Sequence, residues 1–217
     1  IPSRLVGSEM CIRDSIEMGA SYYQGDIRDS SAINRAGQDC THIVHLAAQT
    51  SVPASVENPT LNDEINIIGT RNIIDFINSH DIKKIVSASS AAGYGNCDQI
   101  PLAEESAGEC LSPYAESKFQ NEADLFNLVN DNTGVHVLRF FNVYGPGQGT
   151  ESNYAAVIPS FVEKIISGKS PTIFGDGSQS RDFVEVSDVV SLILQILADQ
   201  NNVPNDVYNV ATQTETS

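Results

Sequence analysis

The sequence has no apolar run near the ~20 residues that a membrane-spanning helix needs, and hydrophobic residues make up only 41% of it. Positive charge is scarce too: 12 Lys and Arg stand against 28 Asp and Glu in 217 residues, which gives a formal net charge of −16. A surface for nucleic acid or an anionic membrane would need a basic patch. We therefore expect a soluble globular protein with neither partner, although one or two placed Arg or Lys residues could hold a phosphate.

Cysteine is also scarce. The four cysteines have no metal-ligand spacing, so no metal site is expected. The histidines lack paired spacing as well, and His45 is expected to be a core or loop histidine. A chain of this length can bury a sizeable core without disulfide bonds. We expect reduced thiols and a cytoplasmic protein.

The first fifteen residues, IPSRLVGSEMCIRDS, have neither the apolar segment of a targeting signal nor a helical period. They resemble peptides that arise when a sequencing adapter is translated as coding DNA. We expect residues 1–15 to be non-native and the natural protein to begin near Ile16, already inside a domain. The alternative is a genuine disordered N-terminus.

From Ile16 onward, apolar β-rich runs alternate with helix-like segments. This alternation indicates βαβ units and an α/β fold with a doubly wound parallel sheet. The expected strands are residues 20–24, 42–47, 84–89, 135–140 and 206–210. The expected helices are about 30–37, 60–79, 113–131, 155–167 and 187–199.

Ligands bind such sheets beyond the carboxyl ends of the strands. The first buried strand ends in two small residues, Ala47 and Ala48, which would let a flat ligand lie against the backbone. The next strand is followed by Ser90, and the one after it by Phe141 and Asn142. We expect these strand ends to converge on one crevice.

The stretch SPYAESK (112–118) predicts the start of a helix, because Ser112 is a favoured N-cap and Pro113 suits the first helical position. Tyr114 and Lys118 then lie one turn apart on the same face. A tyrosine with its usual pKa of about 10 is a poor base, but an ammonium and a helix N-terminus favour the phenolate. If the Ser90 hydroxyl binds the same substrate oxygen as Tyr114, then Ser90, Tyr114 and Lys118 together could take a proton from an alcohol. The alternative is an exposed tyrosine over an ordinary surface lysine.

Seven blocks occur in the order found in the extended short-chain dehydrogenase/reductase family. They are GDIRD (25–29), HLAAQ (45–49), NxxGT (66–70), SSAAGYG (89–95), PYAESK (113–118), RFFNVYGPGQ (139–148) and GDGSQSRDFVEVSDVV (175–190). Over roughly residues 16–217 the chain resembles the NAD-dependent epimerase/dehydratase branch of that family. The resemblance implies a Rossmann-like fold, NAD as cofactor, a UDP-hexose as substrate and a homodimer when the protein is full length.

By this resemblance, Ser90, Tyr114 and Lys118 are the catalytic residues. Tyr114 and Lys118 are also implied to contact the cofactor, together with Asp26, Ile27, Leu46, Ala47, Ala48, Asn66, Phe140 and Phe141. Ser90 is also implied to contact the nucleotide sugar, together with Asn142, Val157, Thr172, Phe174 and Arg181. The guanidinium of Arg181 suits a diphosphate. The alternative for Arg181 is a salt bridge to Asp182 or Glu185.

The chain departs from the family at both ends. The GxxGxxG loop with which the family opens is absent, and the sequence stops at YNVATQTETS, where the family continues into its substrate-binding domain. We therefore expect a doubly wound sheet that is truncated at its N-terminus. Residues 16–150 would form a partial NAD-binding domain, and residues 151–217 part of a smaller nucleotide-sugar-binding region intertwined with the last strands.

Dehydratases of this branch carry an acid pair directly after the residue that matches Ser90, where this chain has Ala91 and Ala92. The expected reaction is therefore NAD-dependent epimerisation of a UDP-hexose at C4 through a transient 4-keto intermediate. One alternative is another nucleotide-sugar oxidoreductase, decarboxylase or dehydratase of the family. The other is a catalytically silent nucleotide-binding protein.

Overall fold

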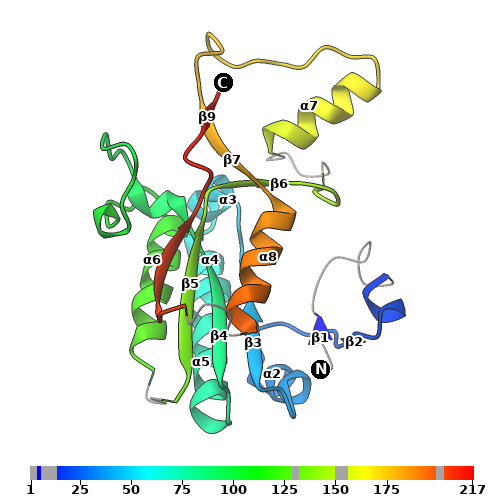
Figure 1. The fold of residues 1–217 in the computed structure, drawn as a ribbon, viewed down its shortest axis with the longest axis vertical. Coiled ribbons are helices and arrows are strands. Elements are labelled where there is room, and N and C mark those ends of the chain that lie inside the picture. The colour runs from blue at the N-terminus through cyan, green and yellow to red at the C-terminus, as the bar shows by residue number, and fades with distance from the viewer. Residues whose placement is uncertain (1–3, 6–13, 129–131, 150–155, 199–202) are drawn as a thin grey trace.

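The computed structural model describes residues 4–5, 14–128, 132–149, 156–198 and 203–217. Its centre is a parallel four-stranded sheet in the order β3-β4-β5-β8 (Figure 1). These strands are β3 (His42–His45), β4 (Lys84–Ser90), β5 (Gly134–Phe140) and β8 (Asp206–Val210). Four of the expected strands are thus confirmed. The expected strand 20–24 is reduced to β2 (Ser21–Tyr22), which pairs with β1 (Arg4–Leu5) apart from the main sheet.

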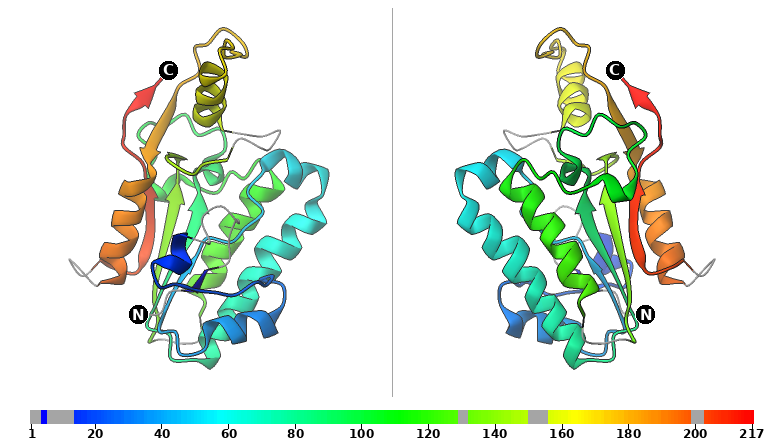
Figure 2. Two further views of the ribbon diagram at one scale, coloured as in Figure 1. Left: turned by 90° about the vertical axis from the view of Figure 1, so that its right-hand side faces the viewer. Right: turned by 90° about the vertical axis from the view of Figure 1, so that its left-hand side faces the viewer.

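Helices cover both faces of this sheet, as expected for a doubly wound fold (Figure 2). One face carries α2 (Ser30–Gly37), α5 (Gly69–Ser79) and α6 (Pro113–Phe126), and the other carries α8 (Val186–Leu197). Successive strand residues point to opposite faces. Ile85 of β4 therefore packs against α5 and α6, whereas its neighbour Val86 packs against α8.

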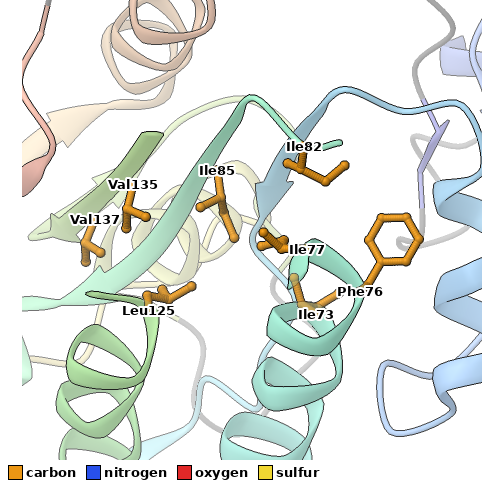
Figure 3. Packing of buried hydrophobic residues seen from close by; sticks show 8 residues of the cluster. All are labelled: Ile73, Phe76, Ile77, Ile82, Ile85, Leu125, Val135 and Val137. Atoms are coloured by element: carbon orange, nitrogen blue, oxygen red, sulfur yellow. The ribbon is translucent and has the colours of Figure 1, made fainter. Parts of the chain in front are cut away.

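The core under α5 and α6 is built from branched apolar side chains. It contains Ile73, Phe76, Ile77, Ile82, Ile85, Leu125, Val135 and Val137, all of which are buried (Figure 3). The second core, under α8, contains Val86, Leu138, Val184, Val189, Ile193, Ile196 and Val210. Residues of both halves of the sequence contribute to these two layers.

The expected helix 60–79 is broken into three pieces. They are α4 (Pro59–Asp63), a π-helical turn η1 (Glu64–Ile68) and α5, and an unpredicted helix α3 (Val52–Glu57) precedes them. Asn58 separates α3 from α4 because its side chain caps the Leu61 amide and Pro59 occupies the first position of α4. The starts of the remaining expected helices are confirmed within two residues. However, α6 ends at Phe126 and α8 at Leu197, before the expected ends at 131 and 199, which lie outside the described residues.

A small three-stranded sheet lies beyond the carboxyl ends of the main strands, beside α7 (Val157–Ile166) (Figure 1). Its order is β6-β7-β9, with β6 (Asn142–Tyr144), β7 (Arg181–Glu185) and β9 (Glu215–Thr216). None of these strands is predicted from the sequence. In the described part of the chain, no helix is long and apolar enough to cross a membrane.

The GDIRD loop is fixed to the start of α5. The Asn72 side chain donates to the Ile27 carbonyl at 3.0 Å, and Arg28 pairs with Glu64 at 3.3 Å. The Ile27 side chain lies against the backbone of Gly69, where a Cβ would come within 2.5 Å of its Cδ1 atom. Gly69 is therefore needed for the close approach of the loop that the sequence assigns to the cofactor.

The contact between Ile27 and Gly69 predicts that Gly69→Ala changes the stability in the direction opposite to the one that helix propensity predicts. Replacing a helical glycine by alanine should stabilise a helix by up to about 1 kcal/mol, but we expect Gly69→Ala to lower the free energy of unfolding because the new methyl group displaces Ile27. Urea denaturation of the wild type, Gly69→Ala, Ile27→Ala and the double variant measures this. Ile27→Ala should relieve the overlap, so the double variant should lose less than the sum of the two single losses. A more stable Gly69→Ala protein would contradict the packing described here.

Candidate active site

Helix α6 begins where the sequence predicts. The Ser112 side chain accepts a hydrogen bond from the Ala115 amide at 3.2 Å, and Pro113 fills the first turn. Tyr114 and Lys118 follow on the inner face of the helix and are only 9% and 5% exposed. The alternative of an exposed tyrosine over a surface lysine is therefore wrong.

Three consecutive residues at the end of β4 hold this helix. The Ala88 carbonyl accepts a hydrogen bond from Lys118 Nζ at 2.8 Å. Ser89 Oγ donates to Glu122 Oε1 at 2.5 Å, and the Ser90 side chain forms a hydrogen bond with the Tyr114 phenol. The structure thus brings the three predicted catalytic residues together. The Ala88 carbonyl and the Glu122 carboxylate help to hold them, and neither of these two groups is predicted from the sequence.

Burial dominates the electrostatics of this group. Desolvation raises the pKa of Tyr114 above its usual value, and the hydrogen bond with Ser90 opposes that rise. Burial also lowers the pKa of Lys118 to about 8, while the Glu122 carboxylate raises it. The sequence analysis expected the surroundings to favour the phenolate. In the protein alone, the Tyr114 phenol is instead stabilised in its protonated form, because burial penalises a phenolate more than Ser90 compensates.

His45 ends β3 next to this group and takes no charge. Its Nε2 atom lies 3.0 Å from Thr70 Oγ1. Burial, assisted by the neighbouring Lys118, lowers the pKa of His45 to about 3, so its ring is neutral. His45 is therefore the core histidine that the sequence predicts. Within the described segments, no group of three or more His, Cys, Asp and Glu residues could hold a metal ion.

Most of the residues expected to contact the cofactor lie before α2 and at the ends of β3 and β5. Asp26 and Ile27 precede α2, and the segment Leu46–Ala48 directly follows β3. Phe140 ends β5, and the Phe141 ring lies 6.2 Å from that of Tyr94. Their contacts with a cofactor stay predictions.

Asn66 is also expected to contact the cofactor, but its side chain forms hydrogen bonds within the protein. Its Oδ1 atom accepts from the Gln49 amide at 2.8 Å, and its Nδ2 atom donates to Gln49 O, Asn62 Oδ1 and Ser117 Oγ at 3.0–3.1 Å. These bonds tie the loop after β3 to α6. In this structure Asn66 therefore acts on the loop after β3 through Gln49 and on α6 through Ser117.

Apart from Ser90, the residues expected to contact a nucleotide sugar lie in the smaller sheet, at the start of α7 and in the segment between α7 and β7. Pairing of β6 with β7 sets Asn142 opposite Phe183, and Asn142 Nδ2 donates to the Asp182 carbonyl at 2.8 Å. Val157 is the first residue of α7, and Thr172 Oγ1 accepts from Lys164 at 2.7 Å. Phe174 is 81% exposed, so its side chain has no formed pocket around it.

Arg181 begins β7, close to Asn142, and keeps its guanidinium exposed. Among the described residues, its Nη1 atom donates to the neighbouring Ser180 carbonyl alone, at 2.7 Å. Asp182 instead accepts from Thr212, and Glu185 from Ser187. Neither carboxylate lies within ion-pair distance of Arg181, so the salt-bridge alternative for Arg181 is wrong.

A hollow of about 490 Å³ lies between the end of β6 and α7. Its lining residues are Tyr144, Gly145, Pro146, Gln148, Ile158, Pro159, Val162, Glu163 and Glu185. None of them is among the predicted site residues. We place the candidate site at the end of β4 on the chemistry of Ser90, Tyr114 and Lys118, because an open, mostly apolar hollow supplies no comparable reactive group.

The sequence analysis missed Glu122 and Arg139. Glu122 accepts from Ser89 and pairs with Arg139 in the protein interior. A signal was available for both residues. Glu122 continues the four-residue spacing of Tyr114 and Lys118. Arg139 is a charged residue in a largely apolar run, and a buried charge requires a partner.

The model of the family described as "NAD dependent epimerase/dehydratase family" matches residues 6–211. A putative UDP-glucose 4-epimerase of Methanocaldococcus jannaschii is 39% identical over 209 residues, which are 94% of this chain and 67% of that protein. UDP-N-acetylglucosamine 4-epimerase from Methanobrevibacter ruminantium, solved in complex with UDP-N-acetylmuramic acid, superimposes with a TM-score of 0.84 at 35% identity, over 91% of this chain and 63% of that one.

A third similar structure is UDP-glucose 4-epimerase from Thermus thermophilus in complex with NAD. It has a TM-score of 0.80 and 31% identity, over 94% of this chain and 67% of that one. The chain therefore spans about two thirds of the length of these three relatives. Its parallel sheet covered by helices on both faces is that of these Rossmann-like enzymes. The chain belongs to the NAD-dependent epimerase/dehydratase family.

Proposed function

We propose that the protein epimerises a UDP-hexose at C4 with NAD as its cofactor. The observation that carries this proposal is the convergence of Ser90, Tyr114 and Lys118 at the carboxyl end of β4, in a chain whose relatives include UDP-sugar 4-epimerases. An epimerase of this kind needs a proton acceptor beside a secondary alcohol, and these residues supply one. It also needs a side chain that binds the diphosphate of the substrate. Arg181 is suited to this, because its guanidinium is exposed and forms no ion pair with Asp182 or Glu185.

The catalytic residues would divide the proton transfer among them. Tyr114 takes the proton from the 4-hydroxyl of the sugar, and the Ser90 hydroxyl, already hydrogen-bonded to the phenol, orients the same oxygen. Lys118 supplies a positive charge one helical turn away, which favours the phenolate against the cost of burial. In the protein alone burial keeps Tyr114 protonated, and the Ser90 hydroxyl is the group that lowers its pKa there.

The residues present fit a dinucleotide. Bound NAD would accept hydride from C4 and return it to the opposite face of the keto sugar. The small side chains of Ala47 and Ala48 leave the backbone after β3 open to a flat ligand. The Asp26 carboxylate pairs with Arg28 at 2.6 Å but remains half exposed, so it could still accept from an amine of the ligand. Next to them, Gln49 Oε1 is buried without a hydrogen-bond partner among the described residues, which leaves an acceptor for a ligand hydroxyl.

The nucleotide sugar would be held at its diphosphate end. Arg181 can turn its guanidinium to two phosphate oxygens without breaking an ion pair. Val157, Thr172 and Phe174 would close around the nucleotide. If most of the binding free energy comes from the nucleotide, the sugar remains free to turn over between the two hydride transfers.

The homodimer expected from the family stays a prediction. The exposed apolar side chains of Leu61 and Ile68 lie two turns apart in the continuous helical run α4–η1 and are the surface that we propose for it. Residues 1–15 as a non-native peptide, and the division near residue 150, likewise stay proposals.

The first prediction from this mechanism concerns Tyr114. In the full-length gene product, Tyr114→Phe removes the proposed base and should lower kcat by about 10²–10⁴-fold, the usual scale of general acid–base catalysis. Affinity for the nucleotide sugar, measured by calorimetry, should change little. Tyr208→Phe is the matched control, because among the described residues the hydroxyl of this half-buried tyrosine donates to the Pro204 carbonyl alone, at 2.8 Å. A Tyr114→Phe enzyme within tenfold of wild type would remove Tyr114 from its role.

A second prediction separates epimerisation from dehydration. Ala91 and Ala92 offer no acid that could expel water from the sugar. We therefore expect no 4-keto-6-deoxy sugar when the full-length gene product turns over UDP-glucose or UDP-N-acetylglucosamine, as followed by mass spectrometry. Accumulation of that product would mean that the dehydratase alternative is the correct one.

A further inference from the structure

Glu122 of α6 and Arg139 of β5 form a buried ion pair. Arg139 donates to the Glu122 carboxylate through Nε at 2.9 Å and through Nη2 at 2.7 Å. Both side chains are less than a tenth exposed, and in the described part of the chain no other ion pair is buried on both sides. Because burying two charges is costly, such a pair is weak evidence for stability and calls for another explanation.

The remaining polar atoms of the pair are also satisfied. Arg139 Nη1 donates to the Tyr94 hydroxyl at 3.0 Å and to the Glu104 carbonyl at 2.7 Å. Ser89 Oγ donates to Glu122 Oε1. The pair therefore joins α6 to β4, β5 and the loop that follows β4, and it has one defined geometry.

This network lies directly behind the proposed proton acceptor. Glu122 follows Lys118 by four residues, so the two side chains share one face of α6, and both are buried. Ala88, Ser89 and Ser90 bind Lys118, Glu122 and Tyr114 respectively. A shift of the Glu122 contact would therefore move the two neighbouring contacts at the same strand end.

We propose that Glu122, held by Arg139, is a positioning residue of the active site: its buried carboxylate supplies the negative charge that faces the Lys118 ammonium, and its bond to Ser89 fixes the register of α6 on β4. The inference rests on the proposed function for its catalytic meaning. Its structural content, the effect of one buried carboxylate on Lys118, does not depend on which sugar is bound.

The charged and titratable groups around Lys118 support this assignment. From its own helix, Glu122 and Tyr114 face it, and from β3 the neutral His45 does. From β5, Arg139 lies on the far side of Glu122. The other charges of the helical layer, such as the Arg71–Asp124 pair, lie on its outer, more exposed side. Burial brings the pKa of Lys118 down to about 8, and only Glu122 raises it.

From the loop after β4, Tyr94 and Cys110 face the Glu122–Arg139 pair. The Tyr94 hydroxyl accepts from Arg139, and the pKa of the Cys110 thiol is raised by burial and by the nearby carboxylates. The Cys110 thiol is therefore neutral near pH 7. Glu122 is thus the one negative charge among the described groups that face Lys118.

The direct test is the pKa of Lys118, measured by NMR with an isotopic label at the ε carbon of lysine. The chain has only five lysines, and Lys118→Arg assigns the signal. Glu122→Gln keeps the size of the side chain but removes its charge, and we expect the pKa of Lys118 to fall by about one unit or more. Glu116→Gln is the matched control, because Glu116 carries the same charge on the exposed side of the same helix, and it should leave the pKa of Lys118 nearly unchanged.

The expected fall in the pKa of Lys118 also predicts a change in the pH dependence of kcat of the full-length gene product. If turnover needs the Lys118 ammonium, activity is lost as the pH rises through the pKa of Lys118. Glu122→Gln should therefore move the alkaline limb of the pH profile to lower pH, whereas Glu122→Asp, which keeps the charge, should restore its position. Should Glu122→Gln fail to fold, Glu122→Gln/Arg139→Gln removes both charges. It should still lower the pKa of Lys118, because the nearer charge is the carboxylate.

A folded Glu122→Gln or double variant with the pKa of Lys118 unchanged would overturn the inference. Equal behaviour of Glu122→Asp and Glu122→Gln would overturn it too, since it would show that the charge is irrelevant. The NMR measurement needs no substrate. Failure of epimerisation with the expected pKa shift would therefore overturn the proposed function alone, and turnover without the shift would overturn the inference alone.

Discussion

The geometry of the site depends on the packing of helix α6 against the carboxyl end of strand β4. Ala88, Ser89 and Ser90 are consecutive in β4, and they bind residues that recur every four positions in α6. The 3.6-residue period of a helix places those residues on one face, and the open strand end offers a carbonyl and two hydroxyls to it. Both reactive side chains are located by this contact. The Ser112 cap fixes where the helix begins, so it also fixes which residues meet β4.

Burial destabilises the charged forms of Tyr114 and Lys118, and neighbouring groups in the hydrogen-bond network oppose this effect. Desolvation opposes the phenolate of Tyr114 and the ammonium of Lys118 alike. A mechanism that uses both charged forms therefore requires compensating groups inside the protein. Ser90 acts on the phenol, Glu122 acts on the ammonium, and Arg139 balances Glu122 in turn. The chain of hydrogen bonds then continues from Arg139 to Tyr94 and from Tyr94 to Asn209 of β8, at 3.0 Å and 2.6 Å.

Features with a local physical signature could be predicted from the sequence. The apolar runs of β3, β4, β5 and β8 and the Ser-Pro start of α6 identified the sheet and the helix correctly. The strands β6, β7 and β9 are two to five residues long and carry no such run, so they appear only through tertiary pairing. The four-residue spacing brought out Tyr114 and Lys118. The sign of the pKa shift of Tyr114 depends on how deeply α6 is buried, which spacing does not show.

The central claim is that this site oxidises and then reduces the same carbon atom. The most direct measurement follows UDP-galactose deuterated at C4 through turnover by the full-length gene product. Hydride that leaves and returns within one site must bring the deuterium back to C4, so the UDP-glucose formed should retain the label, with no net reduction of NAD. UDP-glucose that has exchanged its C4 label for solvent hydrogen, or reduced cofactor that accumulates in step with product, would contradict the account.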